Sequence, residues 1–207
     1  MSLPNQLTTL RIILTPVIVA LLYFETLYFR MASLFFFLLA TLTDWYDGRV
    51  ARKFGHVTSS GQFLDPLADK ILVLSTLFTL AFHNHISMWL VMVIAGRDLF
   101  ITFLRSYAEW KRHPIVTSIS AKWKTASQMA AIYLVLLYLV AEAHFYSIDK
   151  PEWLSWIIQA EAIAVMMQVV TLITVATAIQ YLLENRHHVR SLAHACMRVF
   201  ASGNLAK

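Results

Sequence analysis

Charged residues and cysteine are both scarce in this chain of 207 residues. Lysine, arginine, aspartate and glutamate make up 14% of the sequence, whereas 58% of the side chains are hydrophobic. Soluble domains carry about 25% charged residues, so this composition excludes an ordinary soluble domain and indicates an integral membrane protein. The single cysteine, Cys196, excludes an internal disulfide and leaves the redox compartment undetermined.

Features that would divide the chain or remove part of it are also absent. No repeat with a period of about 20 to 50 residues stands out, and there is no low-complexity linker. Residues 1–6 are not basic, and no small-residue cleavage site follows, so we expect a retained first span and no removable signal peptide. We predict one membrane domain over residues 1–184 and a basic tail over residues 185–207, which either binds anionic lipid or is disordered.

Long apolar stretches predict an all-α fold with about six transmembrane helices. A bilayer core of about 30 Å requires about 20 residues for each helical span. Stretches of this kind lie near residues 8–28, 32–53, 62–82, 87–109, 122–146 and 153–183. Pro4 and Asn5 suggest a short interfacial helix or turn before the first span.

The distribution of basic residues predicts the orientation of these spans. The links after the second and fourth spans, and the tail, are rich in lysine and arginine, whereas the opposite side carries only Arg30 and Lys150. Because cytoplasmic loops carry the excess of positive charge, we expect both termini, and the link between the second and third spans, to be cytoplasmic. The expected location is a bacterial-type inner membrane, with the site described next facing the cytoplasm.

Four aspartates flank the link between the second and third spans: Asp44, Asp47, Asp65 and Asp69. If both segments are helical, the first two are i,i+3 neighbours and the last two are i,i+4 neighbours, so each pair projects from one helix face. One unpaired charge in hydrocarbon costs about 2.5 to 3.5 kcal/mol, so these acids need water, bases or metal ions beside them. Carboxylates suit hard cations, and we predict that the four aspartates bind two divalent cations, Mg²⁺ or Mn²⁺.

The expected divalent cations indicate the type of reaction that the site would catalyse. No cluster of histidine and cysteine has the spacing of zinc ligands. Two cations in a carboxylate cage would clamp a pyrophosphate and stabilise both the attacking and the leaving oxygen, which indicates phosphoryl-type transfer. Two other interpretations stay open: the acids are solvated residues at helix ends, or they line the ion path of a cation transporter.

Small residues lie on the same helix faces as the acids. Gly48 follows Asp44 by one turn and Ala51 follows Asp47 by one turn, which leaves a flat surface against which a base and its ribose can lie. Arg52 adds a guanidinium fork that suits a phosphate. The alternative is that Gly48 and Ala51 belong to a helix-packing interface, where membrane proteins often use small residues.

This region resembles the signature of the CDP-alcohol phosphatidyltransferase family, D-x2-D-G-x2-A-R-x8-G-x3-D-x3-D, with every fixed position present. The resemblance implies that an alcohol attacks the lipid-linked phosphate of CDP-diacylglycerol in the membrane and releases CMP. It also implies that Asp69 is the general base beside the metals. The residues expected to line the CDP site are Gly48, Ala51, Arg52 and Gly61, with Asn5 and Thr8 covering the nucleotide.

A second set of polar residues lies further along the chain and is basic. Arg97 lies well inside the fourth predicted span, where an unpaired guanidinium is costly, so we expect it to face a polar cavity. Lys122 and Lys124, taken alone, fit equally well as lysines whose ammonium groups reach the membrane surface. With Arg97 and Arg105 on the same cytoplasmic half, the four side chains are predicted to bind an acceptor that carries its own phosphate.

Further segments resemble the members of this family that use sn-glycerol 3-phosphate as the acceptor. They are residues 3–11, 43–48, 63–70, 97–98, 104–105 and 122–128. Two positions depart from the pattern: Asp98 stands where glutamate is expected, and Ala121 stands where glycine is expected. A cardiolipin-, serine- or inositol-type acceptor is the alternative. The resemblance also suggests a homodimer, and no nucleic-acid partner is expected.

Overall fold

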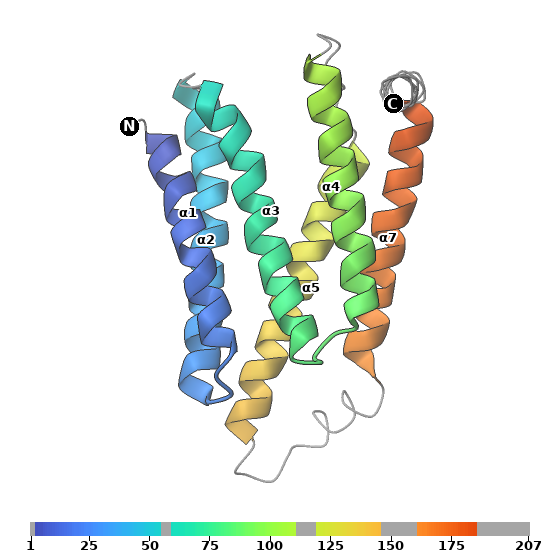
Figure 1. The fold of residues 1–207 in the computed structure, drawn as a ribbon. Helices are drawn as coiled ribbons and strands as arrows, with labels where there is room; N and C mark the ends of the chain where they lie inside the picture. Colours follow the sequence, from blue (N-terminus) through green and yellow to red (C-terminus); the bar gives the residue numbers. More distant parts are fainter. Residues whose placement is uncertain (1–2, 55–58, 111–118, 146–160, 186–207) are drawn as a thin grey trace, which may run out of the picture.

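The computed structural model describes residues 3–54, 59–110, 119–145 and 161–185, with side chains described at residues 9–43, 68–106, 124–145 and 161–185. These ranges form helices and short turns, and they contain no strand. The helices are α1 (Leu3–Leu22), α2 (Leu27–Phe54), α3 (Ser59–Phe82), α4 (Met88–Trp110), α5 (Ile119–His144) and α7 (Ala162–Glu184) (Figure 1). The predicted all-α class is confirmed for this part of the chain.

The helices run side by side as a bundle, and successive helices alternate in direction (Figure 1). Helix α1 packs against α2 and α3, α4 packs against α7 and α3, and α5 connects the two groups through α2 and α7. The start of α1, the end of α2, the start of α3 and the end of α7 lie at the same end of the bundle. The backbone that carries the aspartates therefore lies towards this end.

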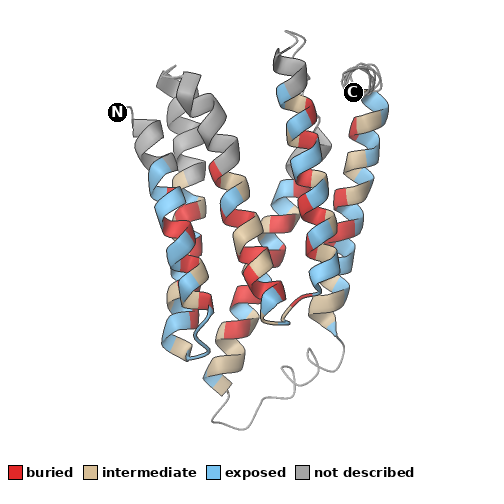
Figure 2. Cartoon of the chain, in the orientation of Figure 1, coloured by how far each residue is buried: buried red, intermediate tan, exposed pale blue. Residues whose placement is uncertain are grey.

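Apolar side chains both fill the bundle and cover its outside. The inner faces carry fully buried residues from each of these six helices, including Ile18, Phe37, Leu77, Ile94, Ile132 and Met167. Large apolar residues are also exposed along the outer faces, which Figure 2 shows in pale blue. An outer surface of this kind is unfavourable in water and favourable in lipid.

Two helical stretches are long and apolar enough to cross a membrane, Lys124–His144 and Ala162–Glu184. Shorter apolar stretches occupy Thr9–Leu22 and Leu27–Thr43. These findings agree with a membrane protein, while the predicted number of spans stays a prediction.

The boundary between the first two helices differs from the sequence-based expectation. The apolar stretch predicted a helix to about residue 28, but α1 ends at Leu22 and α2 already begins at Leu27. The amides of Tyr23 and Phe24 bond to carbonyls three residues earlier, at 3.3 and 3.2 Å, which tightens the last turn. Phe24 and Phe29 then stack across the turn with ring centroids 4.6 Å apart. This turn contains no glycine or proline, so the apolar stretch gave no sign that the helix ends here.

The last span is also shorter than predicted. Its apolar stretch suggested one helix over residues 153–183, but Glu161 has a φ of 47° and lies in the left-handed region, so α7 begins only at Ala162. A right-handed helix cannot pass through that conformation. Residues 146–160, which include the predicted start of this span, lie outside the described residues.

An ion pair joins α2 and α5 at the end of the bundle opposite the aspartates. Arg30, in the first turn of α2, is buried and donates from Nη1 to Oε2 of Glu142 and to the carbonyl of Leu139, both at 2.9 Å. The Tyr138 hydroxyl donates to the other carboxylate oxygen of Glu142 at 3.4 Å. This contact between α2 and α5 gives Glu142 a structural role. Arg30, predicted to lie in a link, instead belongs to a helix.

Candidate active site

The acidic region has the helical backbone that the aspartate spacing requires. Asp44 and Asp47 lie in the second half of α2, and Asp65 and Asp69 lie in the first half of α3. Helical geometry then puts the two members of each pair on one face. The Asp69 side chain is half-buried, while those of Asp44, Asp47 and Asp65 lie outside the described set.

The metal site predicted at the four aspartates stays a prediction. Within the described residues, no three side chains among histidine, cysteine, aspartate and glutamate come together to hold a metal ion. The four aspartates remain the candidate ligands, because carboxylate oxygens are the donors that Mg²⁺ and Mn²⁺ prefer. Of the four, Asp69 alone has a described side chain.

The residues predicted to line the CDP site likewise lie on helices. Helix α1 carries Asn5 and Thr8, α2 carries Gly48, Ala51 and Arg52, and α3 carries Gly61. Their side chains are outside the described set, so their contact with a nucleotide stays a prediction.

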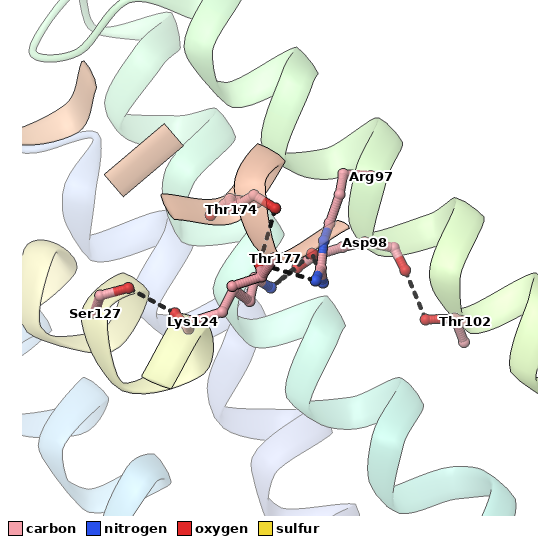
Figure 3. Close-up of polar contacts among 7 residues, drawn as sticks. All are labelled: Arg97, Asp98, Thr102, Lys124, Ser127, Thr174 and Thr177. Carbon is pink, nitrogen blue, oxygen red and sulfur yellow. Dashed lines mark hydrogen bonds and ion pairs between the residues drawn. The ribbon is translucent and has the colours of Figure 1, made fainter. Parts of the chain in front are cut away.

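The basic residues of α4 and α5 meet at a buried carboxylate. Lys124 Nζ bonds to both carboxylate oxygens of Asp98, at 2.6 Å to Oδ1 and 2.5 Å to Oδ2 (Figure 3). The exposed fraction is 7% for the Lys124 side chain and 6% for that of Asp98. Lys124 therefore points into the bundle and not to the membrane surface. Asp98 is the residue that makes a buried ammonium group tolerable.

Arg97 joins the same cluster from the neighbouring position on α4. Its Nη1 donates to Oδ1 of Asp98 at 3.2 Å, and its Nη2 donates to the hydroxyl of Thr177 on α7, also at 3.2 Å. Its Nε is buried and has no hydrogen-bond partner within the described part of the chain. Arg97 thus faces polar groups from α4 and α7 inside the bundle, and Lys124 of α5 completes the cluster at Asp98 (Figure 3). The polar cavity expected around Arg97 stays a prediction.

A lysine that follows the predicted general base links this cluster to the acidic region. Lys70 on α3 is half-buried and lies within Coulombic range of Asp98, Asp69, Arg105 and Arg97. The predicted base and both arginines of the predicted acceptor site, Arg97 and Arg105, are therefore electrostatic neighbours of Lys70.

Two of the predicted acceptor residues are less completely defined. Arg105 lies two turns after Arg97 on α4, is half-buried, and has an Nε with no hydrogen-bond partner among the described residues. Lys122 lies in the first turn of α5, and its side chain is outside the described set.

Sequence reasoning missed two members of the cluster, Asp98 and Thr177. Asp98 could have been found, because a charge inside an apolar helix needs a partner of opposite sign, and Lys124 was already suspected of lying nearby. Thr177 gave no such signal, because α7 also contains Thr171 and Thr174 and its sequence does not show which threonine faces Arg97.

Together these observations define a class of protein. It is an all-helical protein, apolar enough for a membrane, with paired aspartates on two consecutive helices and a buried cluster of cations on the helices that follow. The chain belongs to the CDP-alcohol phosphatidyltransferase family, whose sequence model matches residues 1–180. The resemblance noted in the sequence is thereby confirmed.

Individual relatives share a common name, CDP-diacylglycerol–glycerol-3-phosphate 3-phosphatidyltransferase. The protein of that name from Rickettsia bellii is 36% identical over 136 residues, which cover 66% of this chain and 75% of the relative. That from Rickettsia typhi is 33% identical over 156 residues, covering 75% of this chain and 88% of the relative. That from Salmonella typhimurium is 36% identical over 143 residues, covering 65% of this chain and 76% of the relative.

Proposed function

We propose that this protein transfers a phosphatidyl group from CDP-diacylglycerol to sn-glycerol 3-phosphate, giving phosphatidylglycerophosphate and CMP. Membership of the family supports the reaction type, and the name shared by the relatives supports the two substrates. The observation that carries the choice of acceptor is the buried meeting of Arg97, Lys124 and Asp98 within Coulombic range of Lys70, which itself neighbours Asp69. Basic side chains that share an electrostatic neighbourhood with Lys70 and the predicted base suit an acceptor that brings its own phosphate.

The proposed chemistry divides between the two regions. Asp69 takes the proton from the acceptor hydroxyl, whose oxygen forms a bond to the phosphorus that carries diacylglycerol. The bond from this phosphorus to the bridging oxygen breaks, and CMP leaves with that oxygen. When bound by Asp44, Asp47, Asp65 and Asp69, two divalent cations would supply charge neutralisation at the pyrophosphate.

The side chains of Lys124 and Arg97 retain N–H donors for the acceptor phosphate. An ammonium group has three N–H donors, and the two oxygens of Asp98 accept two of those on Lys124, so one remains. Arg97 uses one N–H towards Asp98 and one towards Thr177, which leaves Nε and the second hydrogens of Nη1 and Nη2. Arg105 and Lys122 would complete the phosphate site.

The membrane setting follows the charge distribution. We propose about six spans, cytoplasmic termini and an active site that faces the cytoplasm of a bacterial-type inner membrane. The start of α1 and the end of α7 share one end of the bundle, which supports placing both termini on one side. A homodimer is part of the proposal because the family resemblance suggests it.

The test is product identification with purified protein in detergent, supplied with CDP-diacylglycerol, sn-glycerol 3-phosphate and Mg²⁺ or Mn²⁺. We expect phosphatidylglycerophosphate by thin-layer chromatography, CMP in equal amount, and loss of both on chelation of divalent cations. Asp69→Asn should abolish turnover, because an amide cannot accept the proton, while the exposed control Glu184→Gln should retain it.

The outcomes separate the proposal from its rivals. Wild-type turnover by Asp69→Asn would overturn the role of Asp69. Product from glycerol, serine, inositol or phosphatidylglycerol, with none from sn-glycerol 3-phosphate, would show that the acceptor site is misassigned.

A further inference from the structure

The last helix contributes a contact to the basic cluster whose geometry suggests a function. Thr177 of α7 accepts a hydrogen bond from one end of the Arg97 guanidinium, and Asp98 accepts one from the other end. We propose that Asp98 and Thr177 are positioning residues, which hold Arg97 and Lys124 in the geometry that binds the acceptor phosphate. This inference rests on the proposed function, because it concerns the same acceptor site.

The hydroxyl of Thr177 is oriented to accept from Arg97. It donates its own hydrogen to the backbone carbonyl of Thr174 at 2.9 Å, which leaves its lone pairs for another donor. The guanidinium of Arg97 can only donate, and its Nη2 reaches this oxygen at 3.2 Å. The two side chains are therefore complementary, and a residue without an oxygen at position 177 could not replace the threonine.

Two contacts from different helices restrict the arginine more than either would alone. An arginine side chain has several rotatable bonds, and ordering it on binding a ligand has an entropic cost. Asp98 lies on the arginine's own helix and Thr177 on α7, so the two bonds fix both ends of the planar fork. A guanidinium fixed before the acceptor arrives binds a phosphate without that cost.

The N–H donors of Arg97 and Lys124 that remain without a partner in the described part of the chain indicate which kind of ligand would suit the site. The Nε of Arg97 is buried and lacks a hydrogen-bond partner within the described residues, although buried donors are normally paired. One N–H of Lys124 also remains after Asp98 has accepted two. An anionic group with several acceptor oxygens, such as a phosphate monoester, would satisfy both donors together.

The test compares three variants of residues on one helix. Thr177→Val keeps the branched shape and removes the oxygen, Thr177→Ser keeps the oxygen, and Thr174→Val is the matched control. The Thr174 side chain is fully buried, whereas that of Thr177 is partly buried. The Thr174 hydroxyl has no hydrogen-bond partner in the described part of the chain. Its backbone carbonyl, which accepts from Thr177, survives the substitution.

We expect Thr177→Val to raise the KM for sn-glycerol 3-phosphate by about three- to tenfold, the effect of one net hydrogen bond. The KM for CDP-diacylglycerol should not change, because neither Thr177 nor Arg97 is among the residues predicted to line the nucleotide site. Thr177→Ser should return the acceptor KM to within about twofold of the wild type, and Thr174→Val should leave it unchanged.

Several results would overturn the inference. An unchanged acceptor KM in Thr177→Val would leave the proposed function intact and refute the positioning role. Equal increases in both KM values, with a matching loss of thermal stability, would show a merely structural contact. A wild-type enzyme that does not use sn-glycerol 3-phosphate would refute the proposed function, and this inference with it, before any variant is compared.

Discussion

Replacing Asp98 with asparagine tests whether this carboxylate makes the buried cations tolerable. The substitution keeps the size of the side chain and one acceptor oxygen but removes the negative charge. Lys124 and Arg97 would then share a neutral amide, although the exposed fraction of their side chains is only 7% and 13%. The uncompensated charge, and not the loss of a contact, is expected to dominate the change in stability.

The expected size follows from the burial of the pair. Removing one partner of a buried ion pair costs about 3–5 kcal/mol. Asparagine can still accept one hydrogen bond from Lys124, so we expect the lower end, about 3 kcal/mol, for Asp98→Asn. In a chain of this length, that corresponds to a fall in Tm of roughly 6–12 °C.

The measurement is thermal unfolding of the detergent-solubilised protein, arranged as a double-mutant cycle. Lys124→Met replaces the ammonium group with an apolar side chain of similar length, so Asp98→Asn combined with Lys124→Met should recover most of the lost stability. Glu184→Gln is the control, because this exposed carboxylate accepts a hydrogen bond from Gln180 one helical turn away. The substitution should change the free energy of unfolding by less than about 0.5 kcal/mol.

Two results would contradict this reasoning. A Tm of Asp98→Asn within about 2 °C of the wild type would mean that Lys124 finds another anion or water. A double variant that is less stable than either single variant would mean that the two side chains stabilise the bundle independently of each other.

Two further predictions concern the protonation of a histidine and the side of the membrane on which the tail lies. Burial, and then the positive charge of Arg30, lower the pKa of His85 in the turn between α3 and α4, so the folded protein binds this proton less tightly than the unfolded chain does. The unfolded chain takes up the proton near pH 6.5, so stability should fall as the pH drops below about 6.5, with a weaker fall in His85→Gln; equal slopes in Tm against pH would contradict this. Cys196, in the predicted tail, is the only cysteine in the sequence, so a membrane-impermeant maleimide should label inside-out vesicles and not intact spheroplasts if the tail is cytoplasmic. Labelling of the spheroplasts alone would reverse the proposed orientation.

The cluster at Asp98 explains how helices far apart in the sequence can serve one site. Its side chains come from α4, α5 and α7, and Lys70 adds α3 at the position next to Asp69. A displacement of any of these helices would change the spacing between the predicted base and the predicted phosphate ligands. Under the proposed function, the packing of α7 therefore influences acceptor binding although α7 carries none of the predicted ligands.

The sequence by itself determined the class of fold, the family and the acidic motif. Apolar stretches separated by short polar links predict helices wherever they occur, because every backbone group in lipid must be bonded within its own segment. The offsets from Asp44 to Asp69 are local, so one helical period sufficed to pair the aspartates on helix faces. Family membership followed from the same residues and is confirmed over residues 1–180.

Only the tertiary structure decided which distant polar groups pair and where the first helix ends. Lys124 fits a membrane-surface lysine as well as a buried one, until α4 brings Asp98 within 2.6 Å of its ammonium group. Thr177 becomes distinct from the other threonines of α7 only because the rotation of that helix turns it towards Arg97. The end of α1 at Leu22 likewise lacks a local signal, since no glycine or proline is there. Contacts of this kind depend on packing between segments up to 112 residues apart, and hydropathy along the chain does not encode them.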